Sequence, residues 1–208
     1  MTTIYLVRHS KPIREEFGLK DIKDDVFLSN VKTPLSVEGE KLAEKISSDE
    51  EFSNIDVIWS SNYVRTISTA KYFAHKNNLK INISDKLGER IHGIKTWNEL
   101  PSDFETHQFD DENYKIGNGE SRKEVTKRLL DAINYLISKY KNKRILVVGH
   151  STAFAFLLST WCNISYTSPY TYNGKVILEE KWNYCETFKL TFDDQDNLID
   201  IENIKLER

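Results

Sequence analysis

Three short segments of the chain place histidine and arginine side chains directly after runs of apolar residues. The first segment is LVRHS, with Arg8 and His9, and the last is VVGHS, with His150. Between them lies WSSNYVR, which contains Arg65. Arginine offers a planar fork of donors that suits phosphate or carboxylate, and a neutral imidazole can act as a nucleophile. These residue types together indicate a site that binds an anion and attacks it with a histidine.

Each of these residues alone is weak support for such a site. A histidine beside a buried strand is more often a hydrogen-bonded core residue, and an arginine one turn into a helix is usually a solvated charge. Their shared position after three predicted strands favours the functional interpretation, because ligands of open α/β sheets bind outside the carboxyl ends of the strands. The helix N-termini that follow would add oriented N–H groups. Neighbouring cations disfavour the charged form of a histidine, so we expect a neutral imidazole there.

The elements that must position these residues alternate between strand and helix. Short apolar runs predict strands at 4–7, 55–59, 80–84 and 144–149. Apolar residues at helical spacing predict a helix that begins after Ser36, a helix with Tyr63, Ile67, Ala70 and Ala74 on one face, and a largely buried helix over 153–161.

The clearest helix is predicted after Ser121, which forms a capping box with Glu124 and precedes apolar residues that recur at helical spacing up to Tyr140. Near the end of the sequence, 187–192 and 198–205 flank a polar turn and predict a hairpin. The alternating order followed by a hairpin predicts an α/β fold. We expect a three-layer α/β/α sandwich with a mostly parallel central sheet and an antiparallel C-terminal edge.

Residues 91–120 depart from this alternation, since they are rich in Asp, Asn, Gly and aromatic residues without sustained periodicity. We interpret them as an excursion over one face of the sheet that serves as a cap or lid within a single domain spanning 1–208. Between Ile91 and Ser121 the chain has two lysines against seven carboxylates. A lid of that charge would disfavour a substrate with a second anionic group.

Composition excludes several classes of protein. The chain has 208 residues, a net charge of −3 and 39% hydrophobic residues, as expected for one globular domain. It has no basic stripe for nucleic acid, no apolar stretch of 18 residues for a membrane, and no signal peptide before its first strand. Two cysteines outside any CxxC pattern favour reduced thiols. We therefore expect a soluble cytoplasmic protein whose partner is a small molecule, with its oligomeric state left open.

The order of the motifs resembles that of the histidine phosphatase superfamily, which includes cofactor-dependent phosphoglycerate mutases and many small-molecule phosphatases. The similar segments lie within about residues 2–160 and are LVRHS, PLSVEGEKLA, SSNYVRTISTA, KLGERIHG, GESRKEVTKR and ILVVGHS. The resemblance implies that His9 takes the phosphoryl group. It further implies that Arg8, Arg65 and His150 bind the phosphoryl oxygens. The acidic residue that donates a proton to the leaving group corresponds to Glu89.

The function that this resemblance implies is hydrolysis of a small phosphomonoester through a phosphohistidine at His9. Phosphoryl transfer depends on positioning and on cations around the equatorial oxygens, which Arg8, Arg65 and a protonated His150 could provide. Two alternatives remain open: transfer of the phosphoglycerate mutase type, and a phosphate-binding module without catalysis. Glu89 has an alternative interpretation as a surface carboxylate paired with Arg90. In that case a carboxylate of the 99–112 stretch would donate the proton.

The sequence departs from the family at three places in the expected pocket floor. Ser10 stands where Gly or Ala is commoner, Lys11-Pro12 replaces the usual acidic or polar residues, and Ser151 stands where Gly is usual. Residues 159–186 match poorly and receive no predicted role. A rival interpretation of GHSTA as a hydrolase nucleophile elbow fails, because no histidine follows His150 to serve Ser151 as a base. No P-loop, HExxH or paired metal-ligand spacing is present, so we expect no cofactor and no required metal.

Overall fold

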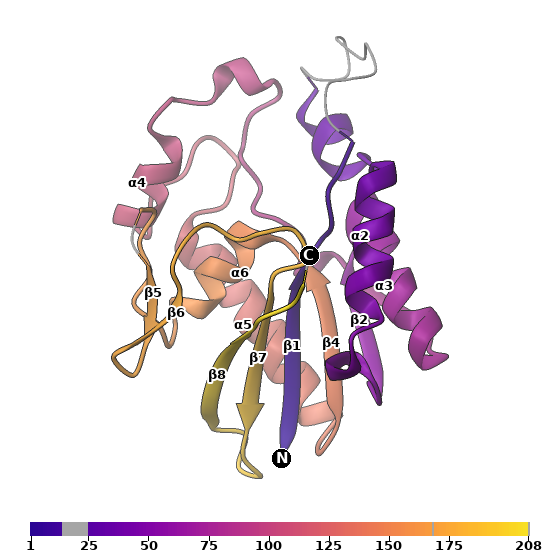
Figure 1. The fold of residues 1–208 in the computed structure, drawn as a ribbon. Helices are drawn as coiled ribbons and strands as arrows, with labels where there is room; N and C mark the ends of the chain where they lie inside the picture. Colours follow the sequence, from indigo (N-terminus) through magenta and orange to yellow (C-terminus); the bar gives the residue numbers. More distant parts are fainter. Residues whose placement is uncertain (14–24, 168, 208) are drawn as a thin grey trace.

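The computed structural model describes residues 1–13, 25–167 and 169–207, and its centre is a six-stranded sheet (Figure 1). The strand order is β3-β2-β4-β1-β7-β8. The strands are β1 (Thr2–Arg8), β2 (Val57–Ser61), β3 (Ile81–Ser84), β4 (Arg144–Gly149), β7 (Thr187–Phe192) and β8 (Leu198–Ile204). The first four of these strands pair in parallel, whereas β7 and β8 pair antiparallel. The predicted mostly parallel sheet with an antiparallel C-terminal edge is confirmed.

Helices cover both faces of this sheet and make it the middle of three layers (Figure 1). The four long helices are α2 (Val37–Ser47), α3 (Val64–Asn77), α5 (Arg122–Lys139) and α6 (Ser151–Leu158). Successive residues of β1 and β4 point to opposite faces. Those that pack with α5 and α6 are Ile4, Leu6, Ile145 and Val147. Those that pack with α2 and α3 are Tyr5, Val7, Leu146 and Val148.

The predicted strands and helices are present, and several of their bounds differ by one to three residues. The capping box of Ser121 and Glu124 opens α5, as expected. β2 begins two residues later than predicted because the Ile55 N–H donates to the Asn77 side chain, at 3.0 Å, and so does not join the sheet. α6 begins at Ser151 rather than at 153. Short 3₁₀ turns occupy η2 (Glu50–Phe52) and η3 (Asp85–Leu87).

Residues 91–120 lie beyond the carboxyl ends of the parallel strands, next to α6 (Figure 1). They contain two elements that sequence periodicity did not show, η4 (Trp97–Glu99) and α4 (Phe104–Asp110). Aromatic contacts hold the segment together, with the His92 ring 5.0 Å from Trp97 and 5.7 Å from Phe104 between centroids. Whether this segment acts as a lid within a single domain stays a prediction.

A second segment at the same end of the sheet is η1 (Phe27–Val31), which is bonded to the excursion. The Val26 N–H donates to the Lys95 carbonyl at 3.1 Å, and Trp97 Nε1 donates to Ser29 Oγ at 2.8 Å. The two segments therefore meet above the carboxyl ends of the strands.

Residues 159–186, which have no predicted role, form a small two-stranded sheet of β5 (Tyr170–Tyr172) and β6 (Lys175–Leu178). It lies alongside α6 and α4 (Figure 1). Near the end of the segment, the ring of Trp182 packs on Phe188 with centroids 4.8 Å apart. No helix among the described residues has the length and apolar character needed to cross a membrane.

Gly39 provides a test of how β1 and α2 fit together. The Ser36 N–H donates to the Lys11 carbonyl, and a Cβ on Gly39 would lie 2.0 Å from that same oxygen. A Gly→Ala change inside a helix normally stabilises by about 0.5–1 kcal/mol. Here we expect Gly39→Ala to destabilise by about 1–3 kcal/mol through overpacking.

The measurement is the free energy of unfolding in urea, with Lys41→Ala at an exposed position of the same helix as the control. The control should change stability by less than about 0.5 kcal/mol. A Gly39→Ala protein as stable as the wild type would show that α2 does not press on the loop after β1.

Candidate active site

The register of two parallel strands brings His9 and His150 together. Arg8 at the end of β1 pairs with Gly149 at the end of β4, and each histidine is the next residue in its chain segment. The His9 N–H donates to the Gly149 carbonyl at 2.9 Å. The two imidazole centroids are 5.4 Å apart, and the side chains are 7% and 0% exposed. The two histidines predicted as site residues are thus neighbours in a buried environment.

His9 has a defined tautomer. Its Nδ1 lies 2.7 Å from the Ser10 carbonyl oxygen. Because a carbonyl only accepts hydrogen bonds, Nδ1 must carry the proton and donate it. In the neutral ring the lone pair then belongs to Nε2, which is the atom that can act as a nucleophile.

His150 is neutral in this arrangement. Arg65 Nη2 lies 3.0 Å from His150 Nδ1, and a guanidinium can only donate, so Nδ1 accepts. His150 Nε2 therefore carries the proton and donates it to Ser61 Oγ at 2.9 Å. Full burial, and next the charge of Arg65, hold the pKa of His150 well below its ordinary value.

Arg65 is held by a residue that the sequence did not indicate. Its Nη1 donates to the Asn30 carbonyl, and its Nη2 donates to Asn30 Oδ1 at 2.9 Å. Burial lowers the pKa of Arg65 to about 10, and the nearby carboxylate of Glu89 opposes that lowering. Arg65 therefore remains a cation at neutral pH. Asn30 stands in η1, outside every motif that pointed to the site.

Arg8 is also held by residues from a segment without a predicted role. Its Nη1 donates to the Trp182 carbonyl, and its guanidinium lies 4.5 Å from the centroid of the Tyr184 ring. The segment before β7 therefore orients one of the two predicted phosphate-binding arginines.

Glu89 lies at the start of α6 beside this group. Its Oε1 accepts from the Ala153 N–H at 2.9 Å and from the Arg90 N–H at 3.0 Å. The Arg90 side chain bonds to Glu105, so the surface ion pair considered for Glu89 and Arg90 is not the arrangement found. Because α6 begins directly after His150, Glu89 belongs to the same end of the sheet as both histidines.

The two serines at which the sequence departs from the family have different surroundings. Ser10 is fully buried, with Oγ donating to the Gly39 carbonyl at 2.7 Å and N–H donating to Thr69 Oγ1 at 2.9 Å. It thus ties the end of β1 to α2 and α3, and its effect on the pocket stays a prediction. Ser151, in contrast, lines a cavity beside the site.

That cavity has a volume of about 310 Å³, and Arg8 and Ser151, the chain neighbours of His9 and His150, are among its lining residues. Its walls come from α4, α6 and the 166–182 segment. Four of the lining side chains are aromatic, and these are Phe109, Tyr166, Tyr170 and Trp182. The charged ones are Arg8, Lys181 and Glu105.

A sequence model of the histidine phosphatase superfamily (branch 1) matches residues 4–196. The chain belongs to this superfamily. Among the described residues, no group of three or more His, Cys, Asp or Glu side chains is placed to hold a metal ion.

Individual relatives carry different names. Phosphoserine phosphatase 1 of Hydrogenobacter thermophilus is 26% identical over 162 residues, which cover 73% of this chain and 72% of that protein. A probable phosphoglycerate mutase of Erwinia tasmaniensis is 26% identical over 77% of this chain and 74% of its own. A mycobacterial glucosyl-3-phosphoglycerate phosphatase, solved with VO3, has a TM-score of 0.71 at 16% identity and 98% coverage of both chains. That structure shares the superfamily fold.

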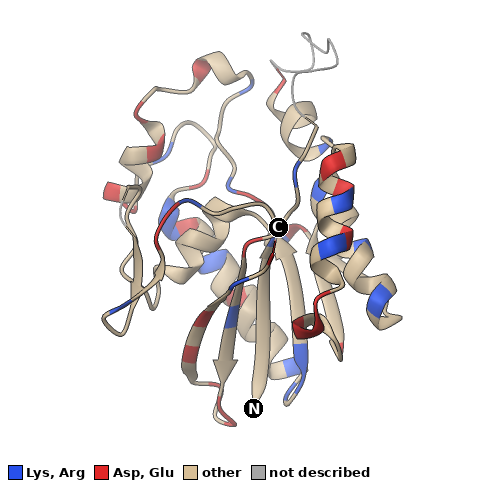
Figure 2. Ribbon diagram, in the orientation of Figure 1, with Lys and Arg blue, Asp and Glu red and all other residues tan. Residues whose placement is uncertain are grey.

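The charge of the 91–120 segment is less one-sided than its composition predicts. Three of its carboxylates form ion pairs with cations outside the segment. Glu105 pairs with Arg90, Glu112 with Lys123 at 3.2 Å, and Glu120 with Arg128 at 2.7 Å. Figure 2 shows the carboxylates spread along the segment rather than gathered at one point. Of the seven, only Glu105 lines the cavity, together with two cations. The predicted repulsion of a second anionic group is therefore overstated.

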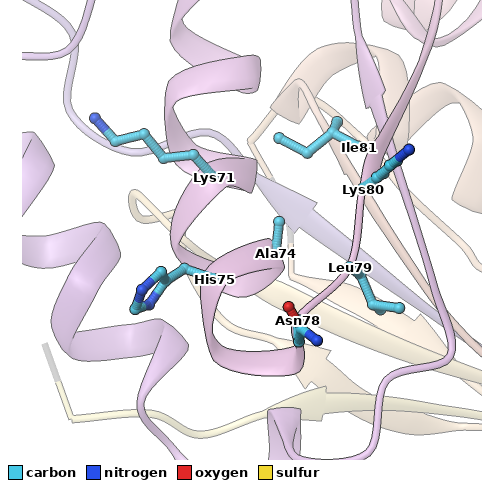
Figure 3. A pocket seen from close by; sticks show the side chains of 7 residues that line it. All are labelled: Lys71, Ala74, His75, Asn78, Leu79, Lys80 and Ile81. Atoms are coloured by element: carbon cyan, nitrogen blue, oxygen red, sulfur yellow. The ribbon is translucent and has the colours of Figure 1, made fainter.

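A larger hollow, of about 490 Å³, lies away from these residues (Figure 3). It is formed where α3 ends and β3 begins, at the amino ends of the parallel strands, with Lys71, His75 and Lys80 among its lining residues. No predicted site residue lines it. Of the two cavities, the smaller one is lined by a predicted site residue, Arg8.

The protonation state of His150 is directly testable by ¹⁵N NMR of its ring. We expect the neutral Nε2–H form to persist below pH 6.5, where a free histidine becomes protonated. Since the unfolded chain then binds a proton that the folded site does not, stability should fall as the pH drops below about 6.5.

Arg65→Gln should raise the pKa of His150, because a neighbouring cation is removed. Arg144→Gln, at the other end of β4, is the matched control and should leave it unchanged. A His150 that titrates near 6.5 in the wild type would contradict the hydrogen-bond assignment.

Proposed function

We propose that this protein is a phosphomonoester hydrolase that acts on a small phosphorylated metabolite through a phosphohistidine at His9. The observation that supports this most is the pair of buried histidines, with the lone pair of His9 on Nε2 and a cationic Arg65 bonded to His150. The phosphatase names of two relatives support the reaction class.

The reaction has two displacement steps. In the first, His9 Nε2 forms a bond to phosphorus as the ester P–O bond breaks, and Glu89 gives a proton to the leaving oxygen. In the second, water attacks the phosphohistidine, Glu89 takes a proton from that water, and inorganic phosphate leaves His9 as it began. Both hydrogen bonds of Glu89 described above fall on Oε1. Oε2 is therefore the oxygen proposed to transfer the proton.

Arg8 and Arg65 supply the positive charge that the equatorial oxygens need in the transition state. For Arg65 to present its fork, the phosphoryl group must replace Asn30 as the acceptor of its two donors. His150 binds the same group by exchanging one of its present partners. Because two arginines provide the charge, we propose that the reaction needs no metal ion, and activity should be unchanged in excess EDTA.

The nature of the acceptor separates hydrolysis from the mutase alternative, which the name of the Erwinia relative favours. A mutase must retain a carboxylated, phosphorylated acceptor and needs cations for it. The cavity beside Arg8 offers Lys181 as its other cation and is otherwise lined largely by aromatic side chains. That lining favours water as the acceptor. The presence of both histidines and both arginines favours catalysis over a binding module.

The phosphohistidine is the first test. Rapid acid quench and alkaline quench of wild-type protein with labelled substrate should show an acid-labile, alkali-stable phosphoenzyme. His9→Ala should remove both the label and phosphate release without unfolding the protein, while His107→Ala, at an exposed position of α4, should change neither.

Circular dichroism checks that both variants are folded. A wild-type protein that releases phosphate without a labile phosphoenzyme would contradict the role of His9. With 3-phosphoglycerate and a bisphosphoglycerate primer, formation of 2-phosphoglycerate faster than phosphate release would show that the protein is a mutase.

Glu89→Gln tests the proton donor. An alkoxide leaving group needs a proton, whereas p-nitrophenolate departs with little help. We expect kcat for glycerol phosphate to fall about 10²–10⁴-fold and kcat for p-nitrophenyl phosphate to fall far less. Glu112→Gln, in the 91–120 segment, should affect neither substrate. Equal losses on both substrates would exclude Glu89 as the acid and make Glu105, which lines the cavity, the next residue to change.

A further inference from the structure

We propose that the cavity beside Arg8 binds a planar ring, so that the preferred substrates are phosphomonoesters whose alcohol carries an uncharged aromatic or heteroaromatic group. A nucleoside 5′-monophosphate represents this class. The inference rests on the proposed function for the reaction, but it concerns binding and can be tested without turnover.

The position of the cavity makes it the place for the body of the substrate. Arg8 precedes His9 and Ser151 follows His150, and both of these neighbours line the cavity. Because Arg8 is proposed to bind the phosphoryl group, the alcohol of the ester would extend from Arg8 into this cavity. The volume of about 310 Å³ falls at the lower end of the range of about 300–1,000 Å³ that is usual for small-ligand sites.

The walls are aromatic rings that are fixed by their own packing. Phe109 of α4 packs on Phe156 with centroids 5.2 Å apart, and Tyr166 packs on Phe109 at 5.7 Å. Trp182 is 7% exposed and packs on Phe188. Aromatic faces that are held rigidly bind planar rings by stacking, at little entropic cost to the protein.

The charged groups around the cavity leave little charge for the substrate body, which favours an uncharged one. Glu105 is bonded to Arg90, and Lys181 Nζ lies 5.4 Å from the centroid of the Tyr166 ring. Arg8 serves the phosphoryl group in the proposed reaction. The hydroxyls of Ser151 and Thr152 line the same cavity and suit sugar hydroxyls or ring heteroatoms. An acyclic amino-acid phosphate would leave most of the aromatic lining uncovered.

Two ligands that share the same phosphorylated hydroxyl provide the test: adenosine 5′-monophosphate and ribose 5-phosphate. Their dissociation constants are measured by calorimetry on the His9→Ala protein, which cannot form the phosphohistidine. Stacking of one base is worth about 1–3 kcal/mol. We therefore expect adenosine 5′-monophosphate to bind at least about fivefold more tightly than ribose 5-phosphate.

Variants of Tyr166, which is 36% exposed, assign that preference to the cavity. In the His9→Ala background, Tyr166→Leu should weaken adenosine 5′-monophosphate selectively, whereas Tyr166→Phe should retain its affinity. Tyr135→Leu, an exposed tyrosine on α5, is the matched control and should change neither ligand.

Equal dissociation constants for the two ligands would overturn the proposal, as would an equal loss for both ligands in Tyr166→Leu. Either result leaves the phosphohistidine test of the proposed function untouched. Conversely, absence of a phosphoenzyme in the wild type would remove the hydrolase mechanism while the binding preference could still be observed.

Discussion

The parallel pairing of β1 with β4 is the constraint on which the site depends. Opposite residues in this pairing are Arg8 and Gly149, so both strands end at the same level and each continues into a histidine. A slip by one residue would turn the alternating core residues of β1 to the wrong faces. Because both faces are buried under helices, the hydrophobic core fixes the register, and the register in turn places His9 beside His150.

The second constraint is electrostatic, since Arg65 and His150 are buried in contact. Two adjacent cations without solvent would repel strongly, and a neutral imidazole removes that cost while accepting a hydrogen bond from the guanidinium. A phosphoryl dianion would reverse this balance, because its charge favours the protonated imidazole. On this argument His150 is neutral when no substrate is bound and becomes protonated when the phosphoryl group binds. Its positive charge would then stabilise the transition state without destabilising the ligand-free protein.

The sequence predicts those parts that local pattern determines. Apolar runs locate β1 and β4 closely, and the capping box marks the start of α5 at Ser121 because the bonds that form it lie within four residues. Asn30 could not be predicted, because its role depends on contact with Arg65, thirty-five residues away in the chain. The same holds for Trp182, whose carbonyl holds Arg8 across 174 residues. α4 and β5 escape prediction since they are short and gain their stability from tertiary contacts rather than periodicity.

The charge of the 91–120 segment likewise depends on tertiary contacts that composition does not reveal. The seven carboxylates of the 91–120 segment predict repulsion, yet cations from α5 and from Arg90 pair with several of them, so net charge along the chain says little about the field in the cavity. The charged side chains that line the cavity, apart from Arg8, come from α4 and from the 166–182 segment. The residues proposed for chemistry stand on the strand ends, on α3 and, for Glu89, in the loop after η3, whereas those proposed for the substrate body stand largely on these two segments. Substitutions in them can therefore alter which ester is accepted without displacing His9, and this separation allows one site to serve different phosphomonoesters.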